Sequence, residues 1–138
     1  DAPFSRHSTH YRLLAHINEV AEAGLMLADF AYSHWPDDWT KKLDRQELLQ
    51  ILLLHDLDKY LLLSDESLER SIAHGTLSAM ILNDLGFDSR VIEAVASHSP
   101  SASLHLDDPA SMILHYCDLF SCDHIYMLVS RTPHYCMK

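Results

Sequence analysis

Apolar residues recur at helical spacing along most of the chain, and this pattern constrains its fold more than any other feature. Over residues 11–32 the apolar positions follow a period near 3.6, which predicts one long helix from Tyr11 to Tyr32. Among 138 residues there are only three Gly and five Pro, so few positions favour tight turns. The 48% apolar content is enough for a sizeable core. We therefore expect a single all-α domain over residues 1–138.

Capping signals predict where the other helices begin and end. Asp44, with Glu47 three residues later, has the spacing of a capping box and predicts a helix that ends at His55. Residues 48–54 of this helix are apolar nearly all round, which predicts that it is buried. Further helix starts are expected near Ser64 or Asp65, around Thr76, after Asp88 and at Asp108-Pro109, with Gly86 and Val129 near two of the ends. Together these signals predict a compact, orthogonal or irregular bundle of five to six helices without strands.

Charge and cysteine content narrow the class of protein. A formal net charge of −10 argues against duplex nucleic acid as a partner, because such binding depends on Lys and Arg. A phosphorylated substrate stays open, since bound metal ions would add local positive charge. No apolar run approaches the ~20 residues that span a membrane. The three cysteines form no CxxC pair and no signal peptide is visible, so we expect a cytoplasmic protein.

Histidine is unusually frequent, with eleven in the chain. The strongest local signal is the pair His55-Asp56, which follows directly on the Leu-rich segment. A polar pair of this kind is costly to bury unless a partner satisfies it. A divalent metal would do so, because neutral imidazole and carboxylate are ordinary ligands of first-row metals.

Four further polar side chains lie on or beside apolar helical stripes, and they are His16, His74, His98 and Asp118. The first has His7 and His10 as competitors, but the apolar helix follows His16 directly. We interpret His115 as a packing residue or a partner of a ligand. The remaining histidines are interpreted as surface or loop residues: His34, His105, His124 and His134.

The order of these residues resembles that of the HD superfamily of metal-dependent phosphohydrolases. The segments that carry the resemblance are 16–21, 54–59, 74–82, 91–98 and 113–118. It extends over nearly the whole chain, from about residue 11 to residue 125. Each segment alone is a weak signal, whereas the ordered set is specific. The resemblance implies an HD-domain helical fold and a hydrolase.

What the resemblance implies for the site is specific. Two divalent transition metal ions (Fe, Mn, Co, Ni or Zn) would be bound, with Asp56 bridging them. One ion would take His16, His55 and Asp118, and the other would take His74 and His98. A metal-activated hydroxide would then hydrolyse a small phosphorylated substrate, which is a phosphomonoester, a phosphodiester or a nucleotide. Lys59 is the candidate phosphate contact, and the expected catalytic residues are Asp56, Lys59 and Asp58.

Two positions and one loop depart from the common family pattern. Asp58 replaces a usual Gly, and its role is open between a partner of a ligand, a proton donor to the leaving group and a solvated turn residue. Ser99 follows His98 where a second His would mark the cyclic-di-GMP phosphodiesterase branch. We interpret the polar loop from Ser33 to Lys42 as a surface excursion with two partly buried Trp, and a substrate entrance lined by Trp35 or Trp39 is the alternative.

Two other functions fit the same fold. Some dinuclear HD proteins resemble mixed-valent di-iron oxygenases, which use the same six ligands to activate O2. Iron content and an oxygen requirement would separate these from hydrolases. A non-catalytic, nucleotide-sensing HD module is the third alternative. It predicts a missing ligand, and the sequence lacks none of the six.

Overall fold

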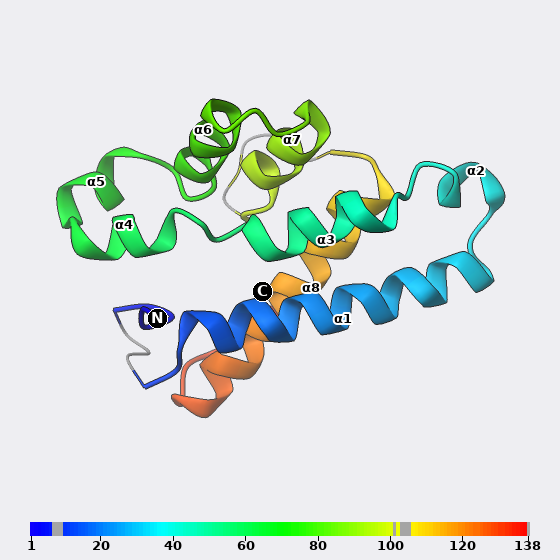
Figure 1. The fold of residues 1–138 in the computed structure, drawn as a ribbon. Helices are drawn as coiled ribbons and strands as arrows, with labels where there is room; N and C mark the ends of the chain where they lie inside the picture. Colours follow the sequence, from blue (N-terminus) through cyan, green and yellow to red (C-terminus); the bar gives the residue numbers. More distant parts are fainter. Residues whose placement is uncertain (7–9, 101, 103–105, 138) are drawn as a thin grey trace.

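The computed structural model describes residues 1–6, 10–100, 102 and 106–137, and within them the protein is helical without strands. The predicted all-α class is therefore confirmed. The elements are α1 (Leu13–His34), α2 (Asp37–Thr40), α3 (Arg45–Leu54), α4 (Lys59–Ser64), α5 (Glu66–Ser71), α6 (Thr76–Asp84), α7 (Ser89–Ser97), α8 (Pro109–Leu128) and the 3-10 turn η1 (His134–Cys136) (Figure 1).

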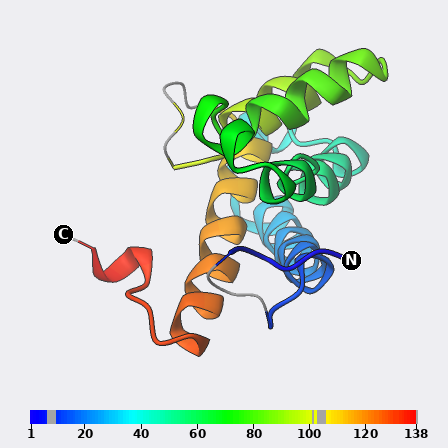
Figure 2. The ribbon, with the colours of Figure 1, turned by 90° about the vertical axis from the view of Figure 1, so that its left-hand side faces the viewer.

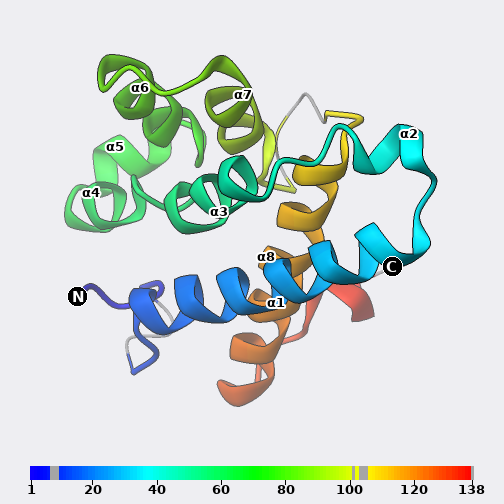
Figure 3. The ribbon, with the colours of Figure 1, turned by 45° about the vertical axis from the view of Figure 1, so that its right-hand side comes forward.

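Helix α3 lies at the centre of the bundle. It packs against α1 and α8 on one side and against α7 on the other, while α6 packs on α7. The long helices α1 and α8 cross each other below α3 (Figure 3). After α8 the chain turns back, so that η1 lies alongside α8 (Figure 2). The crossing of α1, α3 and α8 brings together residues that are far apart in the sequence.

The capping signals start helices where the sequence predicts them. Four Asp side chains accept a backbone N–H from the first turn of a helix, and these are Asp44, Asp65, Asp88 and Asp108. Gly86 adopts a left-handed φ of 79°, and the N–H of Phe87 donates to the carbonyl of Leu82 at 3.0 Å, as expected just after a helix. At α3 only half of the predicted capping box forms, because Glu47 pairs with Arg90 instead.

Two short helices were not predicted. Helix α2 falls in the expected loop of residues 33–42, and α4 follows the His-Asp turn. Both Trp of that loop are partly buried, as predicted: Trp35 packs against the core and Trp39 lines a cavity. The prediction that α3 is buried all round was wrong. The face of α3 that carries Leu49 and Leu53 is not covered by its neighbours, so these two residues are exposed.

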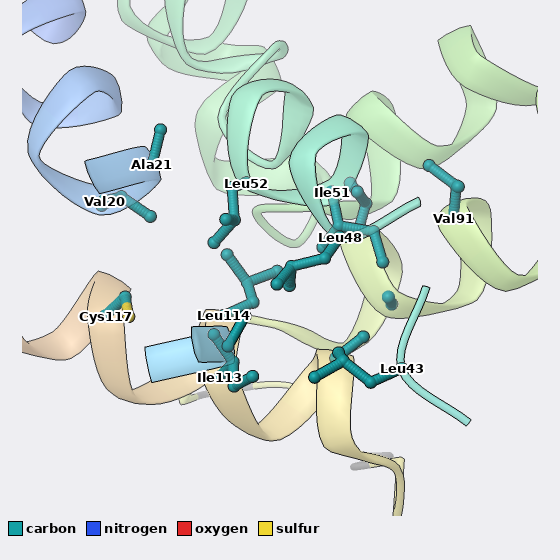
Figure 4. Close-up of a cluster of buried hydrophobic side chains, with 14 of the residues drawn as sticks. Val20, Ala21, Leu43, Leu48, Ile51, Leu52, Val91, Ile113, Leu114 and Cys117 are labelled. Atoms are coloured by element: carbon teal, nitrogen blue, oxygen red, sulfur yellow. The ribbon is translucent and has the colours of Figure 1, made fainter. Parts of the chain in front are cut away.

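The core forms where α1, α3, α7 and α8 meet. Leu48, Ile51 and Leu52 from α3 gather around Leu114 from α8 (Figure 4). Val20 from α1 lies on the side of Leu114 that is away from Leu48. On α1 the buried positions that approach this core include small residues, Gly24, Ala28 and Ala31. Small side chains let α3 approach α1 closely, which holds the turn after α3 against α1.

Gly24 is one of these contact points, and we expect Gly24→Ala to destabilise the protein. A Cβ at this position would lie 2.5 Å from a terminal carbon of Leu52, which is fully buried. Overpacking of about 1–3 kcal/mol should exceed the gain in helix propensity of up to ~1 kcal/mol. Chemical denaturation measures the change in unfolding free energy. The exposed residue Asn18 on the same helix provides the control Asn18→Ala, which should not destabilise. A more stable Gly24→Ala variant would contradict this packing.

No helix within the described residues is both long enough and apolar enough to cross a bilayer.

Candidate metal centre

Six side chains from five parts of the chain converge beside the core. His16 comes from α1 and Asp118 from α8. His55 and Asp56 lie in the turn after α3, where the helix ends and two adjacent side chains can point the same way. The other two are His74, two residues before α6, and His98, at the end of α7. All are buried except His74, whose side chain is 28% exposed. The structure thus brings together all six residues predicted as ligands.

The carboxylate of Asp56 divides this cluster into two halves. Its Oδ2 lies 3.2 Å from Nε2 of His16 and 3.6 Å from Nε2 of His55. Oδ1 of Asp118 approaches the same two nitrogens, at 3.3 Å and 3.7 Å.

The second half gathers around the other oxygen. Oδ1 of Asp56 lies 2.8 Å from Nε2 of His74 and 3.8 Å from Nε2 of His98. The two imidazole nitrogens are 3.2 Å apart. This division matches the two ligand sets that the family resemblance implies, with Asp56 between them.

All four imidazole rings present Nε2 to the interior of the cluster, because their Nδ1 atoms are engaged outside it. Nδ1 of His55 donates to the carbonyl of Leu52 at 2.8 Å, and Nδ1 of His98 donates to the carbonyl of Val95 at 2.6 Å. A carbonyl only accepts, so Nδ1 of each ring carries the hydrogen and Nε2 is left with a lone pair. This is the arrangement of metal-ligating histidines in proteins.

Nδ1 of each of the other two rings also lies close to a polar side chain outside the cluster. Nδ1 of His16 lies 2.8 Å from the hydroxyl of Ser121, one turn after Asp118 on α8. Nδ1 of His74 lies 3.1 Å from Oδ1 of Asp58.

A cation fits the cluster better than the protein groups alone do. Oδ1 of Asp56 is buried and has no hydrogen-bond donor in suitable geometry among the described residues, although Nε2 of His74 is near. A buried, unsatisfied carboxylate oxygen is costly. Two sets of donor atoms are close enough to share an ion: His16, His55 and Asp118, and His55, Asp56 and His98. The residues present therefore fit divalent metal ions.

Without a metal, protons stabilise the same groups. Burial lowers the pKa of His74, but its contacts with Asp56 and Asp58 outweigh burial and raise this pKa to about 10. The pKa of His16 is also raised, because Asp118 and Asp56 outweigh the opposing effect of burial. Burial raises the pKa of Asp56, but Lys59 and His55 outweigh it and hold this pKa well below its usual value.

Asp58 is a positioning residue rather than a solvated one. It is fully buried, so the interpretation as a solvated turn residue was wrong. Its Oδ2 accepts the backbone N–H of Gly75 at 3.0 Å and of Ser78 at 3.3 Å, while Oδ1 faces His74. Gly75 has a φ of +91°, and a Cβ there would lie 2.9 Å from the carbonyl oxygen of Val95. Asp58 thus fixes the tight turn that carries His74.

Lys59 and Phe4 cover one side of the cluster. Nζ of Lys59 lies 2.8 Å from Oδ2 of Asp56 and 3.9 Å from the ring centroid of Phe4. The ring of Phe4 is buried and lies 4.8 Å from that of His16. The position of Phe4 could not be predicted, because nothing in its local sequence distinguishes it. An apolar wall strengthens the electrostatic interactions beside it.

A cavity of about 320 Å³ opens over the cluster, and Lys59, His74 and Asp118 lie in its lining. A larger cavity of about 500 Å³ borders on His98 and includes Trp39 and His115. Pro100, Leu119 and His134 line both, so the two cavities adjoin. A small molecule can thus reach the cluster from solvent. Trp39 lines the larger cavity together with the predicted ligand His98. This position is compatible with the alternative considered from the sequence, a substrate entrance lined by one of the two Trp.

The other histidines that the structure describes lie outside the cluster. His10 is exposed and is not a ligand, while His7 and His105 lie outside the described residues. Nδ1 of His115 approaches the carbonyl of His98 at 3.4 Å, which agrees with a packing role. His34 and His124 are exposed, as predicted. His134, interpreted as a surface or loop residue, lies in the short turn η1 after α8 and is partly buried, with its ring stacked on Tyr126.

Fold and site define an all-helical protein with a buried His/Asp cluster that can hold metal ions. The family model of the HD domain matches residues 13–122, and the chain belongs to the HD domain family. This match confirms the resemblance to the HD superfamily seen in the sequence. Searches of curated proteins and of solved structures gave no significant match.

Proposed function

We propose that this protein is a phosphohydrolase that acts on a small phosphorylated substrate with two divalent metal ions. His16, His55 and Asp118 would hold one ion, and His74 and His98 the other. Asp56, whose two oxygens face the two halves of the cluster, would contribute to both. The observation that carries the proposal is the common orientation of the four imidazoles, whose Nε2 atoms all face the oxygens of Asp56.

Divalent ions in such a pair supply Lewis-acid charge and lower the pKa of coordinated water. The protein's own groups orient the substrate and exclude bulk water. Lys59 lines the cavity with a positive charge, and we assign it to a phosphate oxygen of the substrate. Phe4 closes the side of the cluster next to Lys59 and His16. Asp56 and Asp118 remain ionised because their pKa values are held low, so both stay available to cations.

The size of the opening supports a small substrate. The cavity of about 320 Å³ over the cluster can take a phosphoryl group, and the adjoining cavity of about 500 Å³ can take an organic group. Aromatic side chains in the larger cavity, including Trp39, His115 and Tyr116, suit a nucleoside or another ring-bearing group. We therefore propose a phosphomonoester, phosphodiester or nucleotide as substrate.

The test combines metal analysis with turnover. Protein purified without added metal or chelating resin is analysed for its elements, then assayed with and without oxygen for phosphate release from a panel of nucleotides and phosphoesters. About two equivalents of metal, with oxygen-independent hydrolysis that His55→Ala abolishes, are expected. Two irons with turnover only in oxygen would instead assign the protein to the oxygenases. Nucleotide binding without turnover would assign it to the sensing modules.

We expect Asp58→Asn to weaken metal binding while the fold persists. The amide can still accept a backbone N–H from the 75–78 turn, but it loses the charge that faces His74. Loss of such an orienting partner typically reduces metal affinity by about 10–100-fold. Competition with a fluorescent chelator measures this affinity. Asp65→Asn, which alters an exposed cap of α5, is the control. Unchanged metal affinity in Asp58→Asn would contradict the positioning role.

A further inference from the structure

The proposed hydrolysis needs a proton donor for the leaving group, and Asp58, for which this was one of three roles considered from the sequence, is poorly placed to supply it. An alkoxide leaves phosphorus slowly unless an acid protonates it. Asp58 is fully buried, and its carboxylate is engaged by two backbone N–H groups and faced by His74. It does not line the cavity over the cluster. Another acid must therefore lie where a leaving oxygen would be.

His134, the first residue of η1, is held in a fixed orientation beside this cavity. Its Nδ1 lies 2.8 Å from Oδ1 of Asp123 on α8. The same carboxylate accepts the backbone N–H groups of His134 and Tyr135, so both the ring and its backbone are anchored. The ring stacks on Tyr126 with centroids 5.2 Å apart.

This arrangement leaves one nitrogen available for chemistry. With Nδ1 donating to Asp123, the second ring nitrogen Nε2 has no hydrogen-bond partner among the described residues. A carboxylate that orients one imidazole nitrogen and leaves the other to exchange protons is a common device in enzymes.

The position of His134 matches the expected site of bond cleavage. It lines both the cavity over the cluster and the larger adjoining cavity. A substrate with its phosphoryl group over the cluster and its organic group in the larger cavity has its bridging oxygen at their junction. His134 lies at that junction, together with Pro100 and Leu119, which carry no acidic proton.

We propose that His134, oriented by Asp123, is the general acid of the reaction; this rests on the proposed function. As the bond between phosphorus and the leaving oxygen breaks, its electron pair stays on that oxygen, which takes the proton from Nε2. The oxygen of water forms the new bond to phosphorus, and the proton that water loses restores the imidazolium by way of solvent. For a phosphomonoester the products are an alcohol and inorganic phosphate; for a phosphodiester they are an alcohol and a phosphomonoester.

Two esters of similar size separate this role from a structural one. 4-Nitrophenyl phosphate releases a stable anion, whereas benzyl phosphate releases an alkoxide that requires a proton. In His134→Gln, kcat for benzyl phosphate should fall by about 100-fold or more, while kcat for the nitrophenyl ester falls less than about tenfold. Metal content and the affinity for inorganic phosphate, measured by calorimetry, should match the wild type.

The pH profile adds a readout that anchoring of the chain end would not change. Titratable groups surround His134 on several sides. Asp123 and Tyr126 lie on α8, and the rest line the two cavities that it borders: Lys59, His74, Asp118 and Cys122 in the smaller one, and His98, Asp107, Asp108, His115 and Tyr116 in the larger. Loss of His134 should change the pH dependence of kcat for benzyl phosphate and leave that for 4-nitrophenyl phosphate unchanged. His34→Gln, an exposed histidine at the end of α1, is the matched control and should behave as wild type.

Several outcomes would overturn the assignment. An equal loss on both esters, or no loss on either, would show that His134 is not the acid. If His134→Gln does not fold, His134→Ala with added imidazole replaces it, and failure of imidazole to restore benzyl phosphate turnover counts against the proposal. A wild-type protein that hydrolyses no phosphoester would contradict both the proposed function and the assignment of His134 as the acid. If the wild type is active and His134→Gln changes kcat equally for both esters, only the assignment of His134 as the acid is contradicted.

Discussion

Asp56→Asn is expected to abolish phosphate release, lowering kcat/KM by at least about a thousandfold. Asp56 is the one residue in both halves of the cluster, with Oδ2 toward His16 and His55 and Oδ1 toward His74 and His98. An amide offers one neutral acceptor and places a donor where the second oxygen was, so it cannot bridge two cations. Steady-state assays of phosphate release measure the loss of activity, and elemental analysis measures the loss of bound metal.

The control is Asp84→Asn, which makes the same chemical change at an exposed position at the end of α6. It should retain full activity and metal content. Asp56→Asn should retain its helical circular dichroism, because the core of α1, α3 and α8 does not depend on this carboxylate. Full activity in Asp56→Asn would disprove the bridging role.

Removal of bound metal is expected to cause the largest change in stability. Binding to the folded state alone adds about 4 kcal/mol when free metal exceeds Kd a thousandfold. For a domain of this size, that corresponds to a fall in the melting temperature of roughly 10–20 °C on chelation. Without metal, Asp56 and Asp118 keep two negative charges in a buried cluster. Differential scanning calorimetry with and without chelator measures the effect, and an unchanged transition would contradict it.

The metal-free protein should also depend on pH in a specific direction. The pKa of His74 is raised to about 10 and that of His16 is raised too, so both bind protons more tightly folded than unfolded. Their contribution is complete below about pH 6.5, the usual histidine pKa, and is lost as pH rises toward about 10. Metal binding displaces these protons and strengthens as pH rises. The stability gained from metal should therefore increase between pH 6.5 and 9.

Much of the fold could be predicted because its signals are local. An Asp before a helix satisfies free backbone N–H groups, and Asp44, Asp88 and Asp108 each do so here. The six-residue cluster could be predicted because polar residues on apolar stripes need a partner. Their order along the chain identified the family, and the structure then placed all six side chains together.

The features that sequence missed depend on tertiary contacts. The burial of Asp58 follows from a turn at residues 75–78 that lies far along the chain. Leu49 and Leu53 are exposed because one face of α3 is left uncovered by the other helices, and periodicity cannot show which face in a nearly all-apolar segment. His134 lies against Asp123 because the chain reverses direction after α8, and no local sequence pattern predicts that reversal.

The most direct test of the two-metal account is an anomalous X-ray difference map from crystals of the protein grown with Mn²⁺. We predict two peaks, one between Asp56 and the group of His16, His55 and Asp118, and one between Asp56 and the pair His74 and His98. A map with no peak in this cluster, or with peaks only at exposed carboxylates, would contradict the account.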